Sequence, residues 1–152
     1  WTPLIREHYY ALVSRDHPLS QAQSIDLSTL AGERILLNGT DSPDFIEEQC
    51  LQSGFSPLFA FIGEEYEVLG PLVEMGLGIS FISTLGLYDM KKSLSLEHLS
   101  RISLLRIQND SLSRTLGVLF KKHSYRSPVS KNFYKKLTAY FKLIDFELNN
   151  VY

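Results

Sequence analysis

The amino-acid sequence predicts an α/β fold, in which helices cover both faces of a parallel or mixed sheet. The first observation behind this prediction is that apolar, strand-like segments alternate along the chain with segments of helical periodicity. The second is the apolar run Ile79–Ile82, which follows a glycine turn and suits a strand buried on both faces. The third is composition: 152 residues, 44% of them hydrophobic and 21% charged, suffice for one domain with a substantial core.

The N-terminal part of the chain predicts two strands separated by a polar connection. Tyr9–Val13 is expected to be a strand that stops at the proline-containing turn Asp16–Pro18. Leu27 and Leu30 are placed to anchor a short helical turn. Ile35–Leu37 is then the second strand.

A helix is expected to follow the second strand after a short polar loop. Asp41 or Ser42 can cap this helix, and Pro43 suits its first position. The helix should run to about residue 53 and end at Gly54, which can adopt the left-handed conformation. Leu58–Ile62 is the third predicted strand.

The central stretch predicts a second helix that leads directly into the buried strand. We expect the helix at Glu65–Met75, ended by Gly76. Its apolar residues recur at helical spacing, namely Leu69, Leu72 and Val73. Pro71 within it removes one backbone hydrogen bond and can bend the helix.

The C-terminal third predicts two more strands and a long amphipathic helix. After a partly helical connection at Leu85–Leu99, we expect strands at Ile102–Ile107 and Thr115–Phe120. Ser127 is placed to cap the last helix, with Pro128 at its first position. That helix carries an apolar stripe of Val129, Phe133, Leu137, Phe141 and Ile144. The nearby lysines are best explained as its solvated face.

Ligands of such sheets bind just outside the carboxyl ends of the strands. Three predicted strand ends carry polar residues there, at 38–40, 63–65 and 83–84. The loop from Asn38 to Ser42 also leads into a helix N-terminus, where free N–H groups attract carboxylates or phosphates. On the residues alone, helix capping is the commoner explanation of this loop, and Asp41 would repel an anion.

Several classes of function receive no support. The net charge of −2 gives no global attraction to nucleic acid. The acidic residues Glu64, Glu65 and Glu67 are better explained by the dipole of the helix they open than by acid–base or metal chemistry. The four histidines are not spaced as metal ligands are. The single cysteine, Cys50, is best explained as a small core residue, and its being the only one suits a reducing compartment. We therefore predict no catalytic residues, no metal and no cofactor.

Several segments together resemble the LysR-type transcriptional regulators. Leu72–Ser83, LVEMGLGISFIS, resembles the family signature "lVaaGlGialLP". The strand that ends at His17-Pro18-Leu19-Ser20 resembles the family's strand ending in "HPLA". Further similarity, in the family's order, lies at Ile25–Leu30, Arg34–Asn38 and Ser127–Phe133. No segment resembles the family's DNA-binding helix-turn-helix, so the resemblance identifies the chain as part of an effector-binding domain.

The resemblance implies a Rossmann-like subdomain of a two-lobed fold of the type 2 periplasmic-binding-protein class. Residues 1–124 would form the second subdomain, and residues 125–152 would form the helix that returns to the first, absent subdomain. It implies a cytoplasmic sensor that forms dimers or tetramers, and whose full-length form binds DNA through a separate N-terminal domain.

The expected ligand is a small, anionic effector in the cleft between the subdomains. The expected contact residues are Asn38, Gly39, Thr40, Ser42, Glu65 and Ser83. Pro71 stands where relatives often carry a small or polar residue that faces this cleft. The alternatives are a solute-binding protein, whose gene should encode a signal peptide, and a small enzyme, which should show a nucleophile or base cluster.

Overall fold

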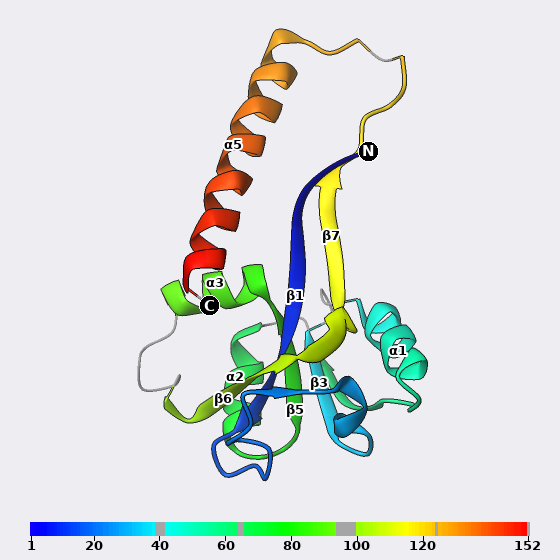
Figure 1. Cartoon of the computed structure of the whole chain (residues 1–152), viewed down its shortest axis with the longest axis vertical. Coiled ribbons are helices and arrows are strands. Elements are labelled where there is room, and N and C mark those ends of the chain that lie inside the picture. Colours follow the sequence, from blue (N-terminus) through cyan, green and yellow to red (C-terminus); the bar gives the residue numbers. More distant parts are fainter. Residues whose placement is uncertain (39–41, 64–65, 94–99, 124, 152) are drawn as a thin grey trace. The chain divides into compact units, whose positions relative to one another are not determined.

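The protein is a mixed α/β structure, as the sequence predicts (Figure 1). The computed structural model describes residues 1–38, 42–63, 66–93, 100–123 and 125–151. Its strands are β1 (Thr2–Ser14), β2 (Ser24–Ile25), β3 (Arg34–Asn38), β4 (Leu58–Gly63), β5 (Ile79–Ser83), β6 (Ile102–Ile107) and β7 (Ser113–Val118). The helices are α1 (Pro43–Gln52), α2 (Tyr66–Glu74), α3 (Thr84–Ser93) and α5 (Pro128–Val151), with 3-10 turns η1 (Leu27–Leu30) and η3 (Gln108–Asp110).

The chain divides into two compact units, which are described separately. The larger unit is His8–Leu112, and the smaller one combines Trp1–Glu7 with Ser113–Tyr152. The chain therefore passes from one unit to the other twice, within β1 and again just before β7. The subdomain boundary expected near residue 124 stays a prediction. The two compact units are defined within this chain alone, whereas the predicted subdomains are the lobes of a larger domain.

The strands form a mixed sheet in the order β2-β6-β1-β5-β3-β4, and β7 also pairs with β1. β1 is antiparallel to both β5 and β6, with Tyr9 opposite Ser83 and Tyr10 opposite Arg106. β3 is parallel to both β4 and β5. The carboxyl ends of β3, β4 and β5 consequently lie at one edge of the sheet.

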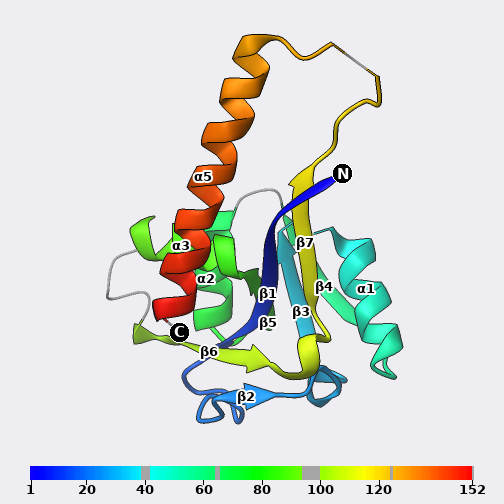
Figure 2. The same ribbon diagram turned by 45° about the horizontal axis from the view of Figure 1, so that its top comes forward.

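Helices of the larger unit cover both faces of the sheet (Figure 2). On one face, α1 contributes Ile46 and Cys50 to a core with Tyr9, Ala11 and Val13 of β1. On the other face, α2 and α3 contribute Leu69, Val73 and Leu87 to a core with Leu12 of β1. All five residues of β5 are buried, which confirms the prediction of a strand covered on both sides.

The smaller unit contains the start of β1, β7 and α5. Ser127 caps α5 as predicted, because its Oγ accepts the Ser130 N–H at 3.1 Å. The ring of Phe120 packs edge-on against Tyr134, with ring centroids 5.1 Å apart. The guanidinium of Arg126 lies 3.9 Å from the centre of the same Phe120 ring, a cation–π contact.

Three predictions about local structure need correction. The first strand begins at Thr2 rather than Tyr9, because its N-terminal half pairs with β7. The seventh strand covers Ser113–Val118 and stops before Phe120. The side chain of Ser42 does not cap α1: its φ of 55° is left-handed, and its backbone oxygen accepts the N–H groups of Phe45 and Ile46 instead. Asp41 lies outside the described residues.

The predicted helix ends are confirmed at two glycines. Gly54 and Gly76 have φ values of +91° and +70°, a conformation that L-residues rarely adopt. The N–H of Phe55 returns to the Cys50 carbonyl and the N–H of Leu77 to the Leu72 carbonyl, which closes the last turns of α1 and α2. Pro71 lies inside α2, as predicted, and its carbonyl still accepts the Met75 N–H at 3.0 Å.

We predict that Gly78→Ala destabilises the protein by roughly 1–3 kcal/mol, the usual range for overpacking a core. A Cβ at this position would lie 2.4 Å from the Arg34 backbone oxygen of β3, so the β3–β5 pairing would have to shift. Gly70→Ala is the matched control, because a Cβ at Gly70 meets nothing within 4 Å and alanine favours the helix. Urea unfolding measures both variants. Equal midpoints for Gly78→Ala and the parent would contradict the prediction.

Candidate functional site

Two of the expected effector contacts, Asn38 and Ser83, lie at the edge where three strands of the larger unit end, and we call this edge the effector rim. Asn38 ends β3 opposite Gly63, which ends β4. Ser83 ends the neighbouring parallel strand β5. Parallel pairing thus brings together the ends of β3 and β5, which are far apart in the sequence, as the pattern of strands and helices predicts.

The individual rim residues differ in what they can offer a ligand. Asn38 and Ser83 are buried, at 3% and 5% exposure, whereas Ser42 is exposed. The Ser83 Oγ accepts the Gly86 N–H at 3.2 Å, which caps the start of α3 but leaves the hydroxyl proton for another acceptor. The expected contacts Gly39, Thr40 and Glu65 lie outside the described residues, as does the Glu64 carboxylate.

A polar cluster next to the rim is not evident from the sequence. The Thr84 Oγ1 accepts the His8 N–H at 3.1 Å and donates to the His8 carbonyl at 3.3 Å. The His8 Nδ1 lies 3.0 Å from the Asp110 Oδ1, and Asp110 has a left-handed φ of 53°. Residues 8, 84 and 110 lack any shared sequence pattern, so only strand pairing could identify this cluster.

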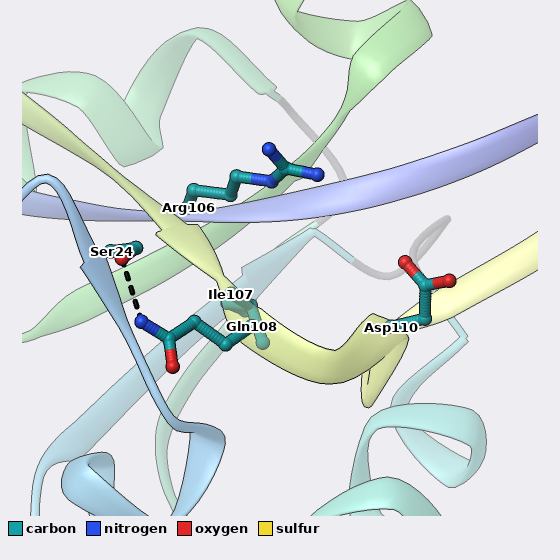
Figure 3. Close-up of a pocket in the computed structure, with 5 residues that line it drawn as sticks. All are labelled: Ser24, Arg106, Ile107, Gln108 and Asp110. Carbon is teal, nitrogen blue, oxygen red and sulfur yellow. Dashed lines mark hydrogen bonds between the residues drawn. The ribbon is translucent and has the colours of Figure 1, made fainter.

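A shallow depression of about 240 Å³ lies on the larger unit, beside the end of β6 (Figure 3). It is lined by Ser24, Arg106, Ile107, Gln108 and Asp110. The Gln108 Nε2 donates to the Ser24 Oγ at 2.7 Å, and these two side chains point toward one another. Because the lining carries one guanidinium and one carboxylate, its charge selects neither an anion nor a cation. No pattern in the sequence indicates this depression.

The described residues contain no group of three or more histidine, cysteine or acidic side chains that could hold a metal ion. His17 Nε2 contacts the Glu33 Oε1 at 3.4 Å and accepts the Leu19 N–H at Nδ1, so it belongs to a turn, as predicted. Cys50 is fully buried in the core under α1, as predicted. Among the described helices, none is long and apolar enough to cross a membrane.

Comparison with known proteins places this geometry in a family. Residues 1–142 match the family described as the LysR substrate binding domain. The chain belongs to this family. The HTH-type transcriptional regulator YybE of Bacillus subtilis is 29% identical over 143 residues, which are 93% of this chain and 46% of YybE. The LysR-family chain thus spans about half the length of the curated relatives it matches.

Solved structures of LysR-family domains share the fold. The effector-binding domain of QuiR, solved with shikimate, is 23% identical, with a TM-score of 0.70 over 93% of this chain and 64% of the solved QuiR domain. The regulatory domain of CcmR from Synechocystis PCC6803, solved with 2-PG, is 18% identical, with a TM-score of 0.73 over 92% of this chain and 65% of the solved CcmR domain. At these identities the likeness establishes the fold, and together with the family match it confirms the predicted periplasmic-binding-protein-like class.

We predict that Cys50 of this LysR-family chain is unreactive in the folded protein. Burial, with a smaller contribution from Glu47, raises the pKa of the Cys50 thiol from 9.0 to about 11. The thiolate, which is the reactive form, is then about a hundredfold scarcer at neutral pH than for an ordinary thiol. Ellman's reagent at pH 8 should label the denatured chain at once and the native chain only as it unfolds.

The same shift makes stability depend on alkaline pH. The pKa of Cys50 is higher in the folded than in the unfolded chain. The buried neutral thiol therefore gives its full contribution to folding stability below about pH 9, and that contribution is lost as the pH rises through about 11. Cys50→Ala should reduce that alkaline loss. Rapid native labelling at pH 8 would contradict the burial argument.

Proposed function

We propose that this chain is the effector-sensing part of a LysR-type DNA-binding transcriptional regulator, and that the effector is a small anionic molecule. One observation carries this proposal: in a domain of the LysR substrate binding family, the paired parallel strands β3 and β5 end at the same edge of the sheet, with polar residues at both ends. Family membership supports a regulatory role, and the position of the rim supports a ligand site.

The anionic character is argued from the hydrogen-bond donors around the rim. The Phe45 and Ile46 N–H groups already bond the Ser42 carbonyl, so they are not available to a ligand. The residue types of the expected contacts also supply hydroxyl donors, at Thr40, Ser42 and Ser83, and an amide donor at Asn38. A carboxylate or phosphate fits such neutral donors at a helix start, although Asp44 in the first turn limits the charge that is tolerated.

Relatives supply the class of ligand and the role of the whole protein. The similar domains of QuiR and CcmR hold shikimate and 2-PG, which are small molecules. YybE is named as an HTH-type regulator of about twice the matched length, which supports DNA binding through a separate helix-turn-helix segment. In this proposal the chain catalyses nothing and works in the cytoplasm. Effector binding shifts the population of assembled states.

We predict that Thr40→Val and Ser42→Ala weaken effector binding. Thr40→Val removes a hydroxyl at nearly constant volume, and a lost hydrogen bond to a buried ligand group costs about 1–3 kcal/mol, roughly tenfold to a hundredfold in affinity. The assay is calorimetry on the natural full-length protein, with a ligand chosen by thermal shift from small carboxylates and phosphates, shikimate and 2-PG included. Thr29→Val, on an exposed residue of η1, is the control. Unchanged affinity in both rim variants would remove this loop from the site.

Homo-oligomer formation is also part of the proposal, and two apolar surfaces support it. β4 ends the described strand order and exposes Leu58, Phe61 and Ile62 at 55%, 37% and 51%. Such an edge offers unpaired backbone groups beside apolar side chains. On α5, Val129 and Phe133 of the predicted apolar stripe are 79% and 65% exposed.

We predict that one of these surfaces is a self-association interface. Leu58→Lys places a charge on the β4 edge, and Phe133→Lys places one on α5. Met75→Lys is the control, since Met75 is 73% exposed and belongs to neither of these two surfaces. Light scattering should show an assembly larger than one chain for the natural protein and the control, and dissociation for one of the two test variants. A monomeric natural protein, or an assembly that survives both substitutions, would contradict this prediction.

A further inference from the structure

Thr84 lies where the proposed effector rim meets the central strand β1. It directly follows the rim residue Ser83, and it is buried, at 8% exposure. Its hydroxyl bonds both backbone groups of His8, accepting from the N–H at 3.1 Å and donating to the carbonyl at 3.3 Å. The Tyr9–Ser83 pair is in register in the β1–β5 ladder, so Thr84 extends that ladder by one residue through its side chain.

His8 in turn holds the segment that leads from β6 to β7. Its Nδ1 lies 3.0 Å from the Asp110 Oδ1. Asp110 has a left-handed φ of 53°, a conformation that aspartate tolerates better than most residues. Just beyond it, the Leu112 carbonyl accepts the Tyr9 N–H at 3.1 Å. The backbone of β1 at residues 8 and 9 is therefore tied to α3 and also to the segment 110–112.

These ties lie at the two places where the chain leaves the larger unit. That unit begins at His8 and ends at Leu112, and every contact described above is internal to it. One continuous path thus joins Ser83 at the rim to Thr84 by the peptide bond, Thr84 to His8 by hydrogen bonds, and His8 to Asp110 by the contact of Nδ1 with Oδ1. The position of this path matters, because a polar cluster elsewhere on the surface would not connect the rim with His8 and Leu112, the two exits at which the chain leaves the unit.

We propose that Thr84 is a positioning residue that ties both exits of the larger unit to the effector rim, with His8 and Asp110 completing the link. A change in backbone geometry at Ser83 then reaches His8 through the Thr84 hydroxyl, and reaches the 110–112 segment through the His8 side chain. This proposal rests on the proposed function for the meaning of the rim, but the link itself is a property of the protein without ligand.

The test is amide hydrogen exchange, measured residue by residue on the natural full-length protein. Thr84→Val removes the hydroxyl at nearly constant volume, and exchange at the His8 amide should become about tenfold faster, with faster exchange at Tyr9 as well. Thr138→Val is the matched control, because it removes a hydroxyl that donates to the Tyr134 carbonyl at 2.8 Å within α5. A change at His8 no larger than in this control would overturn the proposal.

Two further variants keep the test decisive if Thr84→Val does not fold. Thr84→Ser retains the oxygen and should show exchange at His8 close to that of the natural protein. Asp110→Asn removes the charge but keeps a residue that tolerates the left-handed conformation, so exchange at Tyr9 should rise. Unchanged exchange at Tyr9 in Asp110→Asn would separate Asp110 from the link and overturn that part of the proposal.

A ligand arm separates this proposal from the proposed function. With shikimate and 2-PG as probes, protection of the Asn38 and Ser83 amides would report occupancy of the rim. In that case Thr84→Val should bind with similar affinity yet lose the accompanying protection at His8 and Tyr9. Equal protection at His8 in both proteins would refute the coupling. If neither probe protects the rim, that result counts against these effectors alone, and the exchange without ligand still decides the link.

Discussion

The structure depends on the pairing of one long strand, β1. It is antiparallel to β5 on one side and to β6 on the other, and its N-terminal half pairs with β7. Its alternating side chains supply both cores, with Ala11 and Val13 on the face of α1 and Leu12 on the face of α2 and α3. Because strand side chains alternate with a period of two, a slip of one residue would exchange these two sets. The register of β1 therefore determines what each helix packs against.

Polar contacts of β1 are concentrated where the chain leaves the larger unit. Just before that point, the fully buried Glu7 carboxylate contacts the Arg114 Nε of β7 at 2.7 Å. A buried carboxylate is tolerated only with such partners, since an unpaired buried charge is strongly destabilising. Just after it, His8 is held by Thr84 and Asp110. Successive residues of one strand thus carry polar pairings to three other segments, namely β7, α3 and the turn at Asp110.

The proposed effector rim follows from the parallel part of the same sheet. β3 is parallel to β4 and β5, so the polar residues after these strands gather at one edge. An apolar residue at position 83 would cost α3 its cap, because the Ser83 Oγ accepts the Gly86 N–H. At position 42 the backbone carbonyl, not the side chain, receives the first N–H groups of α1. The residues that shape the rim thus also end the strands and start the helices, and the donor left for a ligand at Ser83 is the hydroxyl proton that capping does not use.

The sequence alone determined the order of strands and helices apart from the two-residue β2, with α3 only as a partly helical connection. It also determined the buried character of β5, the glycine ends of α1 and α2, and the family. These features depend on local signals: apolar periodicity, prolines at helix starts, and glycines that adopt left-handed conformations at helix ends. Local signals also placed Asn38 and Ser83 at strand ends, and hence at one edge of the sheet.

Only the tertiary structure decided the length of β1, the conformation of Ser42 and the contacts of His8. Residues Thr2–Glu7 become a strand because β7, more than a hundred positions later, pairs with them, as the Arg6–Ser113 and Arg114–Glu7 contacts show. The left-handed φ of Ser42 and Asp110 has no sequence signal of the kind that glycine provides. Thr84 and His8 are 76 positions apart, and no local pattern reveals a partner at that distance. Short-range energies select helices and strands, whereas hydrogen bonds between distant segments exist only after the sheet has formed.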